Sequence, residues 1–348
     1  MKTGSPRLFK NSSDYISILA TIGLLIVFFI VGSILYPDFC SLQVVSNLFI
    51  DNAYLIVIVV GEALTIITGG IDLSVGSMVA FVSMIAAQLL QMGVSPIVVM
   101  LTVLVVGCVF GTVQGFLIQR FNLHPWIVTL AGMFFARGAS YIISVETIPI
   151  NDSVFSNISG SQIPIGFGAY TTDSVIVALV IVAAAVILMK YTRFGRTVYA
   201  IGGSENSAML MGLPTDRTKI LVYTISGFCS SLGGLLFTIY TLSGYALDCQ
   251  GTEMDAIAAC VVGGILLTGG YGFIIGPMFG VLVTGIIQSL ITFNGTLNSW
   301  WTKVAVGMIL FIFILLQRIV VIRNARQKAS DIADEQQEDF PIPEGVPK

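Results

Sequence analysis

The residues of this sequence that could do chemistry are ionisable side chains inside long apolar runs. Glu62 and Arg137 each lie in the middle of such a run. If these runs cross a membrane, a charged side chain there is costly and is usually paired or functional. We expect Glu62 and Arg137 to form an ion pair that holds two helices in register, with a contact to substrate as the alternative.

Two aspartates lie at the beginnings of other apolar runs. Asp72 follows Gly69-Gly70, and Asp72 or Ser74 can accept hydrogen bonds from the free amides of the next helix. A broken element in a membrane must be buried in protein or line a cavity, so this turn is either a capped hairpin or part of a pathway. Asp255 is the comparable acid at the start of a later run and is most simply an N-terminal cap.

Motifs for nucleotide hydrolysis, metal binding and nucleophilic catalysis are absent from the sequence. It has no GxxxxGKS/T, HExxH or GxSxG pattern. Its five cysteines lack metal-ligand spacing. The single histidine, His124, precedes Pro125 at a helix start, where capping or packing is favoured over a proton relay. We therefore expect no catalytic residues, no metal and no cofactor bound by this chain.

The composition indicates an all-α, polytopic membrane protein. Apolar residues make up 55% of the 348 residues and charged residues 10%, and the mean hydropathy is +0.93. A soluble domain this apolar would expose too much hydrophobic surface to water. Since a transmembrane helix needs about 20 apolar residues, we expect ten spans, several of them short: 14–36, 54–68, 74–92, 97–119, 125–144, 173–190, 220–241, 254–269, 274–293 and 300–317.

The basic residues predict the topology of these spans. With the N-terminus in the cytoplasm, the outer loops 37–53, 93–96, 145–172, 242–253 and 294–299 contain no Lys or Arg, and both termini lie inside. The chain divides into a cytoplasmic segment 1–13, a transmembrane domain 14–317 and an acidic cytoplasmic tail 318–348. Contact with membrane lipid is expected. Without its acidic tail the chain is only slightly basic, so nothing indicates a nucleic-acid partner.

The most informative hydrophilic stretch is the inner segment 190–219. Ser204 can cap a short helix that runs through Met211, with Gly212 as its C-terminal stop. Ala208, Met209 and Met211 give this helix a compact, adaptable surface. It is too short to cross a membrane, and we interpret it as a docking surface for a cytoplasmic partner.

Two glycine-rich stretches suggest an internal repeat. Residues 54–81 and 254–281 each read as an apolar helix, a break and another helix, with the breaks at Gly69-Gly70 and Gly269-Gly270. Elsewhere, Gly107, Gly111 and Gly115 recur at every fourth residue. This spacing places them on one helix face that a neighbouring helix can approach closely.

Four motifs in this order resemble those of the membrane permeases of ABC-type sugar importers, in the branch of the ribose, xylose and galactose permeases. They are Thr68–Ser77, Thr129–Gly138, the 193–212 loop, and Met254–Ala259 with the following Gly263-Gly264 and Gly269-Gly270 pairs. The stretches 146–151 and 295–303 look most like a galactofuranose permease subunit, which pairs with a second, different permease. Glu62 departs from the family, which usually has Met there, and the acidic tail has no counterpart in it.

The resemblance implies a function for the docking helix. Residues 204–212 would be the coupling helix that sits in a groove of a cytoplasmic ABC ATPase, with Ser204, Glu205, Asn206, Ala208, Met209, Met211 and Gly212 as the coupling residues. The ATPase would use ATP and magnesium to switch two permease subunits between inward-open and outward-open states. A periplasmic sugar-binding protein would deliver a monosaccharide at the outer loops, so the protein is expected in the bacterial inner membrane.

Residues of the sugar pathway are less well defined by the sequence. Our candidates are Asp72, Ser74, Arg137, Asp255, Asn298 and Trp300, although Trp at an outer membrane interface is more often a simple anchor. An ion-coupled secondary transporter that uses Glu62, Asp72 and Arg137 is the alternative function. The sequence leaves open whether the permease pairs with itself or with a different chain, and the resemblance favours the heterodimer.

Overall fold

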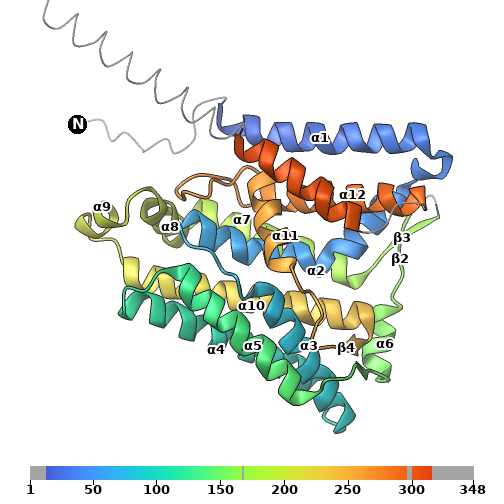
Figure 1. Cartoon of the computed structure of the whole chain (residues 1–348), viewed down its shortest axis with the longest axis horizontal. Helices are drawn as coiled ribbons and strands as arrows, with labels where there is room; N and C mark the ends of the chain where they lie inside the picture. The colour runs from blue at the N-terminus through green and yellow to red at the C-terminus, as the bar shows by residue number, and fades with distance from the viewer. Residues whose placement is uncertain (1–12, 167, 296–299, 316–348) are drawn as a thin grey trace, which may run out of the picture.

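The computed structural model describes residues 13–166, 168–295 and 300–315, and they are mostly helical (Figure 1). The segment 1–13, apart from its last residue, and the tail 318–348 lie outside the described residues. The long helices are α1 (Ser13–Leu35), α2 (Leu42–Ile67), α3 (Val75–Gln91), α4 (Pro96–Arg120), α5 (Pro125–Ile143), α7 (Asp173–Tyr191), α10 (Thr215–Thr241) and α12 (Gly276–Asn294). A further helix covers Trp300–Leu315.

Shorter elements connect these helices. They are η1 (Pro37–Phe39), α6 (Ser153–Ser159), α8 (Arg193–Gly203), α9 (Glu205–Leu210), α11 (Thr252–Val262), and the strands β1 (Ile148–Pro149), β2 (Ile163–Gly166), β3 (Ala169–Thr171) and β4 (Ser243–Gly244). The strands form two antiparallel pairs, β1 with β4 and β2 with β3.

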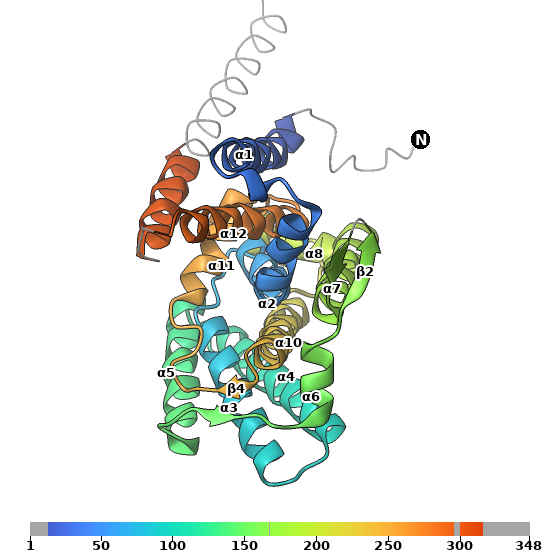
Figure 2. The ribbon, with the colours of Figure 1, turned by 90° about the vertical axis from the view of Figure 1, so that its right-hand side faces the viewer.

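Helices α2 and α10 form the centre of the molecule (Figure 2). They pack against each other, and α10 also packs against α3 and α4, while α2 packs against α7, α11 and α12. Most of both helices is buried, in keeping with their central position. The predicted glycine face of α4 lies against α10: a side chain at Gly107 would overlap Gly227 O and Ser231, and one at Gly111 would overlap Tyr223 O. Here the glycines permit the close approach of two helices.

The long helices run between two chemically different ends of the molecule. Helices α8 and α9 lie at one end, and α6 with the strands β2 and β3 lies at the other (Figure 1). The α8–α9 end carries the basic residues at the end of α4, the end of α7, in α8 and at the start of α10. The described parts of the five expected outer loops contain no Lys or Arg. The structure thus separates in space the two groups of loops that the charge pattern distinguishes.

Seven of the described helices are long and apolar enough to cross a membrane: α1, α2, α4, α5, α7, α10 and α12. Helix α3 and the helix Trp300–Leu315 are shorter and apolar. The expected span 254–269 is not one continuous helix, because α11 ends at Val262. With 11 residues, α11 is about 16 Å long at 1.5 Å per residue and does not cross a bilayer by itself.

The expected outer loop 37–53 also differs from the structure. It holds η1 and the first turns of α2, which begins at Leu42 after a cap in which Ser41 Oγ accepts a hydrogen bond from Val44 N (3.2 Å). The part of α2 that lies in this expected loop includes the polar residues Asn47 and Asp51. They are accommodated in the helix because they line a polar pocket.

Candidate functional site

The predicted docking helix is present as α9, with the expected stop and start signals. Ser204 Oγ accepts a hydrogen bond from Ser207 N (3.3 Å) at the N-cap. Gly212 has a left-handed φ of +74° and donates its N–H to Met209 O, and Leu213 N donates to Ala208 O. This is the pattern of a helix closed by a glycine in the left-handed conformation. The described geometry therefore confirms the local structure expected for residues 204–212.

The surface of α9 is unusually apolar for an exposed segment. Ala208 is fully buried on the inner face of α9, whereas Met209, Leu210 and Met211 are 54%, 90% and 68% exposed. Asn206 is also exposed. We call residues 209–211 the apolar knob. A group of exposed apolar side chains in a polar setting indicates an interaction surface. Sequence reasoning missed Leu210, its most exposed member, since nothing in the local pattern gives its orientation.

Helix α9 is held in place from two sides. Glu205 forms an ion pair with Lys219 of α10 (2.5 Å), so the docking helix is fixed to one of the two central helices. On the other side α8 precedes it directly, and Tyr199 of α8 donates a hydrogen bond from its hydroxyl to Gly272 O (2.7 Å). Burial raises the pKa of Tyr199 to about 12, so this hydroxyl keeps its proton and remains a donor at physiological pH.

Helix α8 also contacts both of the predicted glycine breaks at one point. A side chain at Gly202 would overlap Ile67 O at the end of α2 and Gly270 N of the second break. Gly270 N donates a hydrogen bond to Ile67 O (2.8 Å), which joins the two breaks directly. Gly69 and Gly269 have similar left-handed φ values, +83° and +81°. We call this contact the glycine junction. The two stretches that looked alike in sequence therefore meet in space, next to the segment that carries α9.

Asp72 and Ser74 lie in a buried hydrogen-bond network between helices. Asp72 Oδ1 accepts from Ser74 N (3.0 Å) and Ser74 Oγ (2.6 Å), and Asp72 Oδ2 accepts from Ser226 Oγ of α10 (2.7 Å). Gln114 of α4 donates to Ser74 Oγ (3.1 Å). The network ties the first break to α4 and α10. It does not form the expected side-chain cap, because Asp72 bonds to residue 74 and Ser74 makes no capping bond to α3.

The expected ion pair between Glu62 and Arg137 is wrong. Glu62 is fully buried, and its Oε1 accepts a hydrogen bond from Asp72 N (3.3 Å). Arg137 Nη1 instead donates to Ala246 O (2.7 Å) and Asp248 O (2.8 Å), so it holds the loop that precedes α11. Backbone carbonyls can also accept the N–H groups of a guanidinium, and the sequence gives no sign of which acceptor the fold provides.

The remaining pathway candidates do not join this network. The N-cap of α11 is Gly251 and not Asp255. The carboxylate of Asp255 instead pairs with Lys303 Nζ (2.5 Å) of the helix Trp300–Leu315. Trp300 is 73% exposed at the first turn of that helix. Asn298 lies outside the described residues. The five described candidates are thus distributed over at least three places, and among them Asp72 and Ser74 share one hydrogen-bond network.

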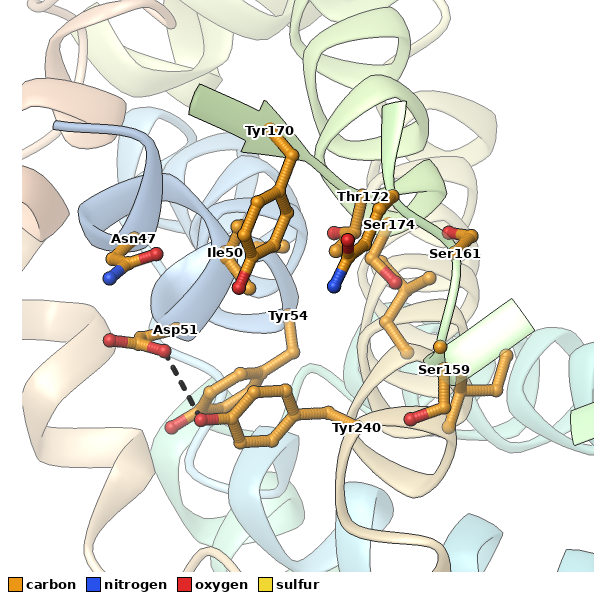
Figure 3. A pocket seen from close by; sticks show the side chains of 15 residues that line it. Asn47, Ile50, Asp51, Tyr54, Ser159, Ser161, Tyr170, Thr172, Ser174 and Tyr240 are labelled. Atoms are coloured by element: carbon orange, nitrogen blue, oxygen red, sulfur yellow. Dashed lines mark hydrogen bonds between the residues drawn. The ribbon is translucent and has the colours of Figure 1, made fainter. Parts of the chain in front are cut away.

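A polar pocket of about 380 Å³ lies at the end of the molecule away from α9 (Figure 3). Its lining includes Asn47, Asp51 and Tyr54 from α2, Tyr170 from β3 and Tyr240 from α10. Sequence reasoning missed this pocket, because Asn47, Asp51 and Tyr170 lie in expected outer loops, where polar residues and tyrosines are ordinary. The signal that could have found it is the polar row Asn47 and Asp51, spaced by four residues on one face of a helix.

Comparison with known proteins places these features in a family. Residues 44–315 match the family described as "Branched-chain amino acid transport system / permease component". The inner membrane ABC transporter permease protein YjfF of Escherichia coli is 44% identical over 314 residues, which cover 90% of this chain and 95% of that protein. The chain belongs to this permease family. The matched range begins inside α2 and ends at the last described residue of the helix Trp300–Leu315.

Other relatives of this permease carry sugar names. The fructose import permease protein FruG of Bifidobacterium longum is 39% identical, with 90% of this chain and 94% of that protein covered. The ribose import permease protein RbsC of E. coli is 30% identical, with 84% and 91% covered. No solved structure matches the chain. The resemblance to ABC sugar permeases is therefore confirmed. The protein is a multi-pass inner membrane permease subunit and is not itself catalytic, since hydrolysis belongs to a separate ATPase component.

Proposed function

We propose that this permease subunit moves a monosaccharide across the inner membrane by alternating access, driven through α9 by a cytoplasmic ABC ATPase. The observation that carries the proposal is the apolar knob, exposed at the basic end of the molecule and fixed to α10 by the pair of Glu205 and Lys219. The glycine junction then links the same segment to both breaks. A displacement of α9 is thereby transmitted to the helices around the membrane core.

The named relatives support a sugar as substrate. FruG and RbsC are named for fructose and ribose, and MglC of E. coli, 32% identical, is named for galactose and methyl galactoside. We propose galactofuranose as the specific sugar on the resemblance of 146–151 and 295–303, of which residues 296–299 lie outside the described part. We also propose that both termini lie in the cytoplasm, as the distribution of basic residues predicts.

The partners follow from this mechanism. The ATPase supplies ATP and magnesium chemistry, a periplasmic sugar-binding protein supplies the sugar, and a second, different permease supplies the other half of the path. The domain division into 1–13, 14–317 and 318–348, with 190–219 as the coupling loop, stays part of the proposal.

The test is sugar uptake by vesicles that contain the complex isolated through a tag on this chain. Uptake of labelled galactose is expected to require ATP inside the vesicles and the copurified ATPase and binding protein. Uptake driven by a sodium or proton gradient without ATP would contradict the proposal and favour an ion-coupled transporter. For that alternative, Glu62 and Asp72 lie together, but Arg137 bonds elsewhere.

The coupling role of α9 has its own test. Gly212→Val places a branched side chain at φ +74°, which costs about 1–2 kcal/mol in the left-handed region and distorts the end of α9. We expect ATP hydrolysis that no longer responds to sugar and uptake reduced at least tenfold, with normal amounts of protein in the membrane. Ala208→Leu, in the same helix, should have the same effect, because Ala208 is fully buried and a larger side chain there displaces α9. Normal coupled transport in both variants would refute the docking role.

A further inference from the structure

The pocket at the end away from α9 is built from four segments that are distant in sequence. Its walls are the first half of α2, the end of α6 with the residues after it, the segment from β3 to the start of α7, and the end of α10. In Figure 3 the side chains of Asp51, Tyr54, Tyr170 and Tyr240 lie to the left and centre of the view, and Thr172 and the labelled serines lie to the right.

The lining has the chemistry of a site for a neutral, hydroxyl-rich molecule. Among the described residues it offers one carboxylate, two side-chain amides, four Ser or Thr hydroxyls and three tyrosines, and it includes no Lys, Arg or His. A carboxylate accepts hydrogen bonds from hydroxyl groups, and a side-chain amide both accepts and donates them. Aromatic rings cover the apolar faces of a ring-shaped ligand.

Several of these groups are held in position but retain bonding capacity. Tyr240 Oη donates to Asp51 Oδ1 (3.1 Å), the dashed line in Figure 3. Gln43 Nε2 donates to the carbonyl oxygen of the Asn47 side chain (2.7 Å), which leaves the amide N–H groups of Asn47 for another acceptor. Thr172 Oγ1 is buried and has no hydrogen-bond partner in the described part of the chain. A buried hydroxyl without a partner is unfavourable unless a ligand or water completes it.

The size of the pocket suits one sugar ring. Small-molecule sites have volumes of about 300–1,000 Å³, and the value of about 380 Å³ lies at the lower end. We propose that this pocket is a low-affinity binding site for a neutral monosaccharide, with Asp51 and Asn47 as its polar contacts and Tyr54, Tyr170 and Tyr240 as its aromatic walls. The proposal rests on the sugar permease function and adds to it a site in this chain where the sugar is held.

The two main walls of the pocket also reach the docking segment. Helix α10 contacts α8 and α9 at its first turns and carries Tyr240 at its last turn, and α2 contacts α8 and carries Asp51 near its start. A ligand between α2 and α10 therefore contacts two helices that both reach α8, and α10 also contacts α9. A bound sugar can stabilise one position of α2 relative to α10. Because these helices contact the α8–α9 segment, that position also changes the surface that α9 presents to the ATPase.

The experiment measures binding of radiolabelled D-galactose, D-ribose, D-fructose and L-leucine to the full-length permease in lipid nanodiscs prepared without sugar detergents. Wild type is compared with Asp51→Asn and Tyr240→Phe, which change one polar group each. Asp38→Asn is the control, because Asp38 is exposed in η1 and does not line the pocket. Size-exclusion profiles report folding of each variant.

We expect at least one of the three sugars to bind in the millimolar range, and Asp51→Asn and Tyr240→Phe to weaken it about tenfold or more while Asp38→Asn leaves it unchanged. Sugar binding that is equal in all four proteins would overturn the proposal, as would binding of L-leucine alone or of none of the probes. Vesicle uptake of the same sugars separates this outcome from a failure of the proposed function. ATP-dependent uptake that is unchanged in Asp51→Asn would leave the permease function standing and remove the pocket from the path.

Discussion

The apolar knob on α9 gives a quantitative prediction for assembly with the ATPase. Leu210 is 90% exposed, so almost its whole side chain is available for burial in a partner. Burying a leucine side chain contributes about 1.5–3 kcal/mol, and about 1.4 kcal/mol corresponds to a factor of ten in affinity. We therefore expect Leu210→Ser to raise the dissociation constant for the ATPase about 10- to 150-fold.

The assay is binding of the purified ATPase to the permease in nanodiscs, followed by biolayer interferometry. Thermal unfolding of Leu210→Ser should match wild type, since exposed substitutions change stability by less than about 0.5 kcal/mol. Met92→Ser is the matched control, because Met92 is 67% exposed at the end of α3, in the region predicted to be outside. Equal affinity of Leu210→Ser and Met92→Ser for the ATPase would refute the assignment of α9 as the docking element.

Two further predictions concern the buried contacts. Gly202→Ala should lower both the unfolding temperature and sugar uptake, because the new methyl group overlaps Ile67 O and Gly270 N. Gly203→Ala is the control: its methyl group has no atom within 4 Å, so both quantities should stay close to wild type. Ser226→Ala should destabilise the protein by about 1.5–3 kcal/mol, because it removes the hydrogen bond to Asp72. Ser230→Ala removes a buried hydroxyl that has no hydrogen-bond partner in the described chain. In the same thermal assay, this second variant should be as stable as wild type or more stable.

Local signals in the sequence were sufficient for the docking helix. Ser204 and Gly212 mark its ends because a cap and a left-handed stop depend on neighbouring residues alone. The likeness of the two glycine breaks was also visible, since each break needs glycines at its own positions. That the two breaks form a hydrogen bond to each other was not visible, because it depends on how α2 and the segment after α11 pack.

Long-range partners account for what sequence reasoning missed. Arg137 and Glu62 were paired because opposite charges in apolar runs are expected to meet, yet the fold supplies Arg137 with carbonyls of a loop more than 100 residues away. Asp255 was taken for a cap, and its partner is Lys303. Asn47 and Asp51 fall in the expected loop 37–53 but lie in α2, where they line a pocket that three other segments complete.

The glycine junction also limits how this sequence can change during evolution. Gly202, Gly269 and Gly270 face backbone atoms, so a side chain at any of them overlaps the backbone itself. Such an overlap cannot be removed by shortening a neighbouring side chain. A second substitution within the junction cannot relieve such an overlap, because glycine is already the smallest residue. The three positions, which lie in two segments about 70 residues apart, are therefore expected to change together through a rearranged backbone or not at all.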